Sequence, residues 1–505
     1  MSRPRRVVRF TIRFKFLFAF LLAGFVKPSL AEDLSLDVFL ETLKREHPFV
    51  ESQLASGRVA EFERDSELGG RDWKFDASLG YGYREPSELG LAVSESHTDF
   101  GLDASLSREI WETGGEFSVS IFDRFENTRS QVAAQPELGI SSSAFFVPDF
   151  YQKGVFLGYN QPLLKNRGGT LNTVQYELKN FDSLLAKVRS AETSESFLLE
   201  AARLYLSWAE LEAKKRILKK RVKLSGSQLN QTRRMTDAGV KENEDLFRSE
   251  ESFWAIKKNL ALVEANSLGL QEQIGVLLGR KSGDGLRVKF DLLTKVQDRT
   301  VEELRSKLTK QSRVLKLLNL NKERILREIE SKEEEDAHDL DLELRAGLTE
   351  GEESYFSAFE VEKPDISASL NYSRTLGGTS NKADLARLAA RKLQVEKEYQ
   401  SELNQLLARA SSLAKQLTKY GEVIDANRKQ LSSAVNRTRS EQKVYKQGRG
   451  ELNFVIQSQD SEQTARFQLF ELGAAYQSLN LELEALVDEL FVVDEAEFSQ
   501  KHSGR

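Results

Sequence analysis

A 3.5-residue apolar repeat, sustained through two long segments, limits what this chain can fold into. The repeat runs through 170–277 in the first half and 380–490 in the second, with spacings that mostly alternate between three and four residues. In the second half it passes through Leu403, Leu406, Ala410, Leu413, Leu417, Tyr420 and Ile424. A repeat of this period predicts helices in coiled-coil contact. The longer helices, of about 70 residues, would reach about 100 Å, and few globular domains contain such a helix.

The two halves of the chain show the same order of patterns. An offset of 209 residues places Gly239 on Gly448, and an offset of 265 places Phe39 on Leu304. We therefore predict a duplicated unit that consists of a helix, strands, a long helix and a return helix. The first repeat covers 32–290, with a helix at 34–67, strands at 73–163 and long helices at 170–280; the second covers 291–490, with a helix at 300–335, strands at 339–373 and long helices at 380–490; a polar tail follows at 491–505.

The predicted strands have one apolar and one polar face. In WKFDASLGYGY, residues 73–83, aromatic or aliphatic side chains alternate with charged or small ones. The strands are about 9 to 11 residues long, which is the length of a tilted strand that spans a bilayer. We therefore predict that their apolar faces meet lipid. The predicted lipid-facing residues are Trp73, Phe75, Leu79, Tyr81, Phe100, Leu102, Leu342, Leu344, Ile366 and Leu370.

A barrel made from these strands needs more than one copy of the chain. One chain supplies about six strands, whereas a barrel needs roughly eight before its interior even fills with side chains. Beyond residue 31 no segment approaches the roughly 18 consecutive apolar residues of a membrane-spanning helix. The sequence therefore predicts a mainly α fold whose transmembrane β-structure is shared between protomers.

The first 31 residues have the pattern of a secretory signal peptide. A basic stretch precedes the apolar run LFAFLLAGFV, and Ser29 and Ala31 fit a small-x-small cleavage site. Removal of this segment takes away seven basic residues and no acidic ones, so the formal net charge falls from −5 to −12. An acidic exported chain is a poor partner for nucleic acid, which demands a basic surface. The chain also has no Cys, so its stability must come from packing or oligomerisation rather than from disulfides.

Four segments together give the chain a resemblance to the TolC-type outer-membrane efflux family. LGYNQPLLKNRGG and RTLGGTSNKA resemble the family's two strand-to-helix junctions, and DAGVKENEDLFRSE and VYKQGRGELNFVIQSQ resemble its two helix-hairpin tips. The resemblance implies a homotrimer in which a β-barrel in the outer membrane continues into a long α-helical barrel in the periplasm. It also implies a passive exit duct for substrates that an inner-membrane transporter pumps through a periplasmic adaptor protein.

The resemblance further assigns roles to residues at the tips. Asp245 and Tyr445 would latch the closed periplasmic end, and Gly239 and Gly448 would lie where the adaptor packs. The alternative for the first pair is that Asp245 merely begins the return helix near its positive end and that Tyr445 packs. The pore constriction, where acidic rings can stand in the family, would instead be formed by Asn453, Phe454 and Gln457. An additional hairpin at 98–127 departs from the simplest members and leaves the number of barrel strands open.

Other functions receive little support from the sequence. The four His residues are scattered, and no metal-ligand spacing such as H-E-x-x-H occurs, so we predict no metal, no cofactor and no enzyme activity. The acidic run at 328–341 is interpreted as a solvated helix end. The competing hypothesis is a secreted, soluble coiled-coil interaction or structural protein. The substrate stays open among drugs, metals and polypeptides, the last including cargo of type I secretion.

Overall fold

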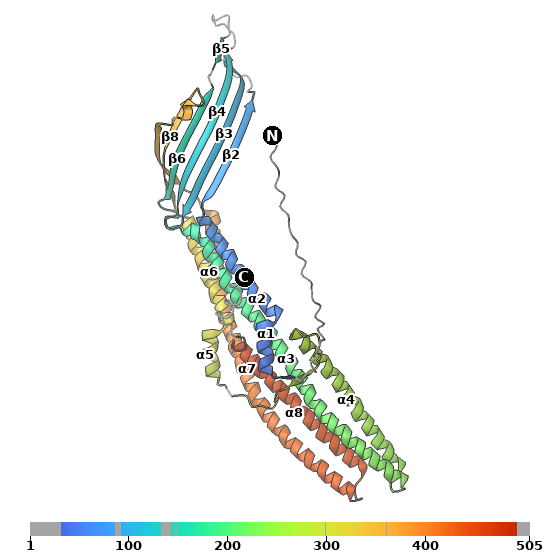
Figure 1. The fold of residues 1–505 in the computed structure, drawn as a ribbon. Helices are drawn as coiled ribbons and strands as arrows, with labels where there is room; N and C mark the ends of the chain where they lie inside the picture. The colour runs from blue at the N-terminus through green and yellow to red at the C-terminus, as the bar shows by residue number, and fades with distance from the viewer. Residues whose placement is uncertain are drawn as a thin grey trace, which may run out of the picture.

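The computed structural model describes residues 32–85, 92–132, 143–146, 149–297, 299–359 and 361–491. The predicted signal peptide and all but the first residue of the predicted polar tail lie outside these ranges. Within them the chain is elongated: a β-sheet forms one end, and helices run away from it to two hairpin tips at the other end (Figure 1). No helix of the described ranges is apolar over a length that would cross a bilayer.

Two hairpins of long helices contain the four longest helices of the described chain. The first consists of α3 (Thr170–Asp237) and α4 (Asn243–Leu277), and the second of α7 (Thr379–Lys446) and α8 (Leu452–Leu486). Both pairs contain one helix of 68 residues and one of 35 residues, and each helix of the second pair begins 209 residues after its counterpart. The heptad positions of α7 that face its neighbours, such as Leu413, are buried, as the coiled-coil pattern predicts.

The shorter helices correct the sequence analysis, which predicted one continuous helix at 34–67 and another at 300–335. The structure breaks each into two: α1 (Leu36–Glu46) and α2 (Pro48–Ser66), then α5 (Val301–Gln311) and α6 (Arg313–Glu335). The first break lies at His47, whose backbone is extended because a residue before proline disfavours the helical region. The second lies at Ser312, whose side chain caps α6 by accepting a hydrogen bond from the Leu315 amide.

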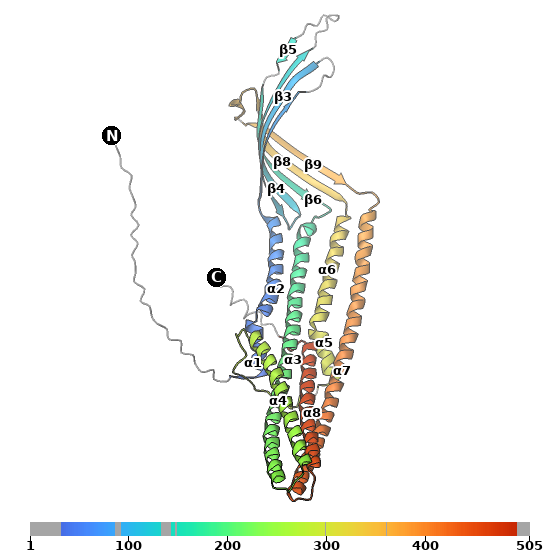
Figure 2. The ribbon, with the colours of Figure 1, turned by 90° about the vertical axis from the view of Figure 1, so that its right-hand side faces the viewer.

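The sheet contains six consecutive antiparallel neighbours and one short addition. Its order is β2 (Lys74–Arg84), β3 (Ala92–Ile110), β4 (Gly115–Val132), β6 (Phe150–Pro162), β8 (Asp339–Glu352) and β9 (Lys363–Ser373), with β5 (Ser143–Phe146) paired to β4. β3 and β4 have 19 and 18 residues, well beyond the expected 9 to 11. Figure 2 shows that the sheet is curved, with β8 and β9 splayed away from β3.

A buried hydrophobic core lies near the middle of this elongated, rod-shaped chain. Here α1, α3 and α8 meet around Phe39, Tyr205 and Trp208, none more than 1% exposed. The hydroxyl of Tyr205 donates to the Leu34 carbonyl at 2.6 Å. Leu34 ends β1 (Glu32–Leu34), which pairs in parallel with β7 (Leu286–Val288). The sequence analysis missed both of these three-residue strands, which bring the start of the described chain to the end of the first hairpin.

Candidate functional site

The two hairpin tips lie next to each other at the end of the rod opposite the sheet (Figure 2). Each tip turns at a glycine in the left-handed region: φ is +69° at Gly239 and +75° at Gly448. The next amide of the chain, that of Val240 or Arg449, donates back to the helix, which is the pattern of a Schellman turn. A side chain at either glycine would meet no atom within 4 Å, so the surface around both tips is open.

Lys241 connects the two residues predicted to latch the tips. Its ammonium lies 3.3 Å from a carboxylate oxygen of Asp245 and 5.2 Å from the ring centroid of Tyr445. The Tyr445 hydroxyl is buried and, among the described residues, has no hydrogen-bond partner. Within one chain, therefore, Asp245 and Tyr445 are not joined by a direct hydrogen bond; a lysine cation bridges the carboxylate and the face of the ring.

The predicted constriction residues share the outward face of the first turns of α8. Asn453, Phe454 and Gln457 are exposed, whereas Leu452 and Val455 are buried against the rest of the hairpin. Phe454 has 45% of its surface exposed, which is high for a large apolar side chain. This face has no covering element in the described chain.

Above the tips, Arg221 ties the first hairpin to the second. It lies on α3, is only 7% exposed, and its guanidinium contacts Gln459 and donates to an Asp460 carboxylate oxygen at 2.6 Å. Burial lowers the pKa of Arg221, while the Asp460 carboxylate favours its charged form. A planar guanidinium can hold two acceptors at once, so this contact fixes α3 against α8.

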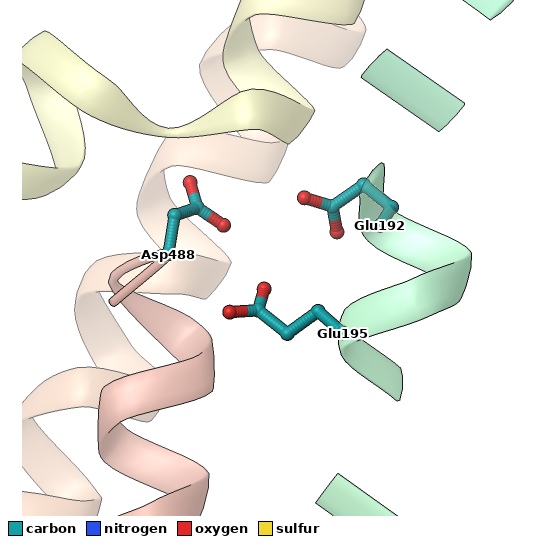
Figure 3. Close-up of side chains that lie close together, drawn as sticks. All are labelled: Glu192, Glu195 and Asp488. Atoms are coloured by element: carbon teal, nitrogen blue, oxygen red, sulfur yellow. The ribbon is translucent and has the colours of Figure 1, made fainter. Parts of the chain in front are cut away.

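A second ion network lies halfway up the rod. Glu192 and Glu195 on α3 face Asp488, which follows α8 (Figure 3). Arg313, the first residue of α6, meets all three: its Nε lies 3.0 Å from Glu192 and 3.2 Å from Asp488, and its Nη2 lies 2.5 Å from Glu195. Burial raises the pKa of Glu192 to about 7 and that of Glu195 to about 8. Because the guanidinium supplies the counter-charge, the geometry fits a buried ion network rather than a metal site.

The sheet separates apolar from polar side chains. The predicted lipid-facing residues lie on one face, where Leu79 stands opposite Leu102 and Leu342 opposite Leu370. Most are strongly exposed, and Tyr81 reaches 72%. The other face borders a polar hollow of about 790 Å³, whose lining includes Asp76, Ser105, Ser120, Arg124, Glu343 and Asp365.

The fold is similar to the folds of several solved outer membrane proteins. No family model matches the chain, and no curated protein is similar to it in sequence. The outer membrane protein VceC from Vibrio cholerae superposes over 90% of this chain and 96% of its own, with 12% identity and a TM-score of 0.63. The CmeC outer membrane channel of Campylobacter jejuni superposes over 92% and 88%, with 9% identity and a TM-score of 0.63. The open state of the MtrE outer membrane channel of Neisseria gonorrhoeae superposes over 90% and 89%, with 12% identity and a TM-score of 0.62.

The chain has the TolC-type fold. This confirms the resemblance that the junction and tip segments carried at the level of sequence. The likeness covers both the sheet and the long hairpins, because nine-tenths of the chain takes part in each superposition.

Three groups of residues in this TolC-type fold were missed by the sequence analysis. Lys241 lies in the turn four residues before Asp245 and outside α4, so no helical spacing in the sequence indicates this ion pair. The partners of Arg221 lie more than 200 residues away in sequence, and those of Arg313 more than 100, so no local pattern reveals them. These contacts depend on how the hairpins pack against one another.

Proposed function

We propose that this chain is the outer-membrane channel-tunnel of a tripartite export system. It would serve as a passive exit duct for substrates that an inner-membrane transporter pumps through a periplasmic adaptor. The observation that carries the proposal is the TolC-type fold, which matches solved outer membrane channels along nine-tenths of the chain. Those neighbours are channels rather than enzymes, and we propose no catalytic role and no cofactor.

In the proposed assembly three copies close one ring. The apolar face of the sheet meets outer-membrane lipid, the polar face lines water, and the helices form a barrel in the periplasm. Only closed barrels let β-structure cross a bilayer without unpaired backbone groups. We further propose that residues 1–31 are removed on export and that the chain is an internal duplication with a boundary near residue 290. The equal lengths of the paired helices support the duplication.

The hairpin tips would form the gate. Asp245 and Tyr445, with Lys241 between them, would hold the closed state. Iris-like opening would then need this contact released in every copy. The exposed face of Asn453, Phe454 and Gln457 would narrow the pore, so that an apolar ring from Phe454 impedes ions when the tips are closed. The open surface around Gly239 and Gly448 suits an adaptor that packs on the tips.

Membrane fractionation tests the proposal. The channel should stay with the outer membrane after carbonate extraction and should leave it, as a trimer, only in detergent. A mature chain that is monomeric and soluble without detergent would instead support the competing hypothesis of a secreted coiled-coil protein. Loss of export by a strain that lacks the chain, restored by the wild-type chain, would then establish the duct role.

A further inference from the structure

We infer that the barrel formed by three copies of this chain has eighteen strands, with an outer mouth wide enough for bulky hydrated cargo. The inference rests on the proposed function, because it takes the threefold ring from there. What it adds is the number of strands per copy, and that number comes from the sheet itself. The sequence analysis had left it open because of the additional hairpin at 98–127.

The additional hairpin lies within the plane of the sheet. β3 is paired with β2 from Lys74 opposite Ser107 to Arg84 opposite His97, and β4 is paired with β6 from Glu116 opposite Asn160 to Glu126 opposite Phe150. A hairpin stacked on the sheet would leave β2 free to pair with β6, but these two strands are separated by both strands of the hairpin. The six strands therefore form one continuous wall.

Both faces of this wall continue across all six strands. One row of facing residues is entirely apolar and comprises Phe75, Leu106, Val119, Leu157, Ala346 and Ile366. The adjacent row on the opposite face is polar or small except for Phe156 and comprises Asp76, Ser105, Ser120, Phe156, Gly347 and Asp365. The hairpin thus carries the same lipid-facing and water-facing pattern as its neighbours.

The base of the hairpin is built into the junction between sheet and helices. Its turn packs Trp111, which is 5% exposed, and the Gln161 amide donates to the Thr113 carbonyl at 2.8 Å. A side chain at Gly169 would lie 1.5 Å from the Trp111 carbonyl oxygen, so the junction has room only for glycine there. The junction and the hairpin turn therefore fit each other.

The two edges of the wall suit a ring of copies. β2 and β9 each have 11 residues and one neighbour. Because six strands alternate in direction, β9 of one copy runs antiparallel to β2 of the next. An open edge of this kind is a hazard for aggregation unless another strand pairs with it. The alternating strand directions and the continuous apolar face both indicate that a second copy of this chain pairs with each edge.

Strand number determines the width of the mouth. With strands about 4.8 Å apart and tilted by about 40°, eighteen strands give a backbone diameter of about 36 Å, whereas twelve give about 24 Å. Barrels of 16 to 18 strands leave an aqueous channel. The mouth should therefore admit polymers, such as polypeptide segments, that a twelve-stranded mouth excludes.

The experiment counts strands and measures access. Imaging of the purified trimer in lipid nanodiscs should show eighteen strands in cross-section; a trimer with twelve strands and a hairpin outside the wall would overturn the inference while leaving the proposed function intact. A soluble monomer would instead sink the proposed function, and the inference with it.

The access measurement uses the absence of native Cys. Ser367→Cys lies on the polar face of β9, and the matched control Ala368→Cys lies on the apolar face. Maleimide-linked polyethylene glycols of increasing length, added from outside, should label Ser367→Cys up to a larger size in the full chain than in a variant lacking 92–132. Ala368→Cys should stay protected by lipid. An equal size limit in the full chain and in a trimeric deletion variant contradicts the wide mouth; if the deletion variant does not assemble, the strand count alone decides.

Discussion

Lys241, on the tip of the first hairpin, holds its ammonium 5.2 Å from the ring centroid of Tyr445 on the second hairpin. The same ammonium pairs with Asp245 at 3.3 Å. Lys241 therefore joins the two tips of one chain through its positive charge. If the tips move apart when the gate opens, this contact must break.

Replacement of Lys241 by Met should make the closed gate leaky. Of the two contacts of the Lys241 ammonium, only the cation–π contact crosses between the tips, because Asp245 lies in the same tip as Lys241. This contact contributes about 0.5 to 1 kcal/mol. A loss of about 1 kcal/mol per copy shifts the closed-to-open equilibrium of each tip about fivefold. Conductance in planar bilayers should rise, and Lys241→Arg should restore much of the wild-type value. Lys443→Met, at an exposed position of α7, is the matched control and should change nothing.

The Tyr445 ring, rather than its hydroxyl, should matter for closure. The hydroxyl has no partner among the described residues, whereas the ring face receives the Lys241 cation. Tyr445→Phe should therefore leave closed-state conductance near wild type, and Tyr445→Leu should raise it. If Tyr445→Phe alone opened the channel, the hydroxyl would have to bind a group supplied by another copy.

Phe454 should limit ion flow through the closed tips. Replacement by Ala removes the exposed apolar ring and should raise closed-state conductance, because an apolar constriction obstructs water and ions. Gln457→Ala, on the same helix face, should have a smaller effect. Bilayer recordings of both variants at one salt concentration provide the comparison, and unchanged conductance in Phe454→Ala would refute the apolar gate.

The Arg313 network should make stability fall as pH rises. Burial raises the pKa of Glu192 and Glu195 from 4.5 to about 7 and about 8, so the folded state binds protons more tightly than the unfolded state. The stabilisation of the folded state by these protonated carboxyls is fully present below about pH 4.5 and is lost as pH rises through about 7 to 8. Glu195→Gln, which mimics the protonated form, should match wild type at pH 5 and be more stable at pH 9.

For Glu195 alone, the stability lost between pH 5 and pH 9 is on the order of 4 kcal/mol, because about three pH units separate pH 5 from its raised pKa and each unit is worth about 1.4 kcal/mol. Thermal unfolding of the detergent-solubilised protein at the two pH values measures it. Glu200→Gln changes an exposed glutamate on the same helix and should not alter the pH dependence. A Glu195→Gln variant with the wild-type pH dependence would show that these carboxyls do not set it.

Much of the fold could be predicted from sequence because its strongest signals are periodic. The heptads of α3 and α7 and the alternation in β2 and β9 extend over many residues, and each repetition adds to the same indication. The helix breaks at His47 and Ser312 each depend on a single capping residue. The sequence analysis missed them because the apolar helical pattern continues on both sides of each break. Only Pro48 offered a local warning.

The candidate site was less accessible to sequence reasoning because its contacts are distant in the chain. The resemblance pointed to Asp245 and Tyr445, but the cation between them comes from the turn itself. Arg221 and Arg313 meet partners on other helices, and nothing near either arginine indicates which carboxylate it will reach. Helix packing, rather than composition, decides these pairs.

The two free edges of the sheet also imply that one subunit with a defective edge prevents more than its own share of the chains from assembling. In the proposed ring of three, one copy whose β9 edge cannot pair would leave the whole ring open, so the two intact subunits beside it would not form a barrel either. If wild-type and edge-blocked chains are made together and mix at random, the yield of intact rings should fall as the cube of the wild-type fraction. Such an allele would be genetically dominant.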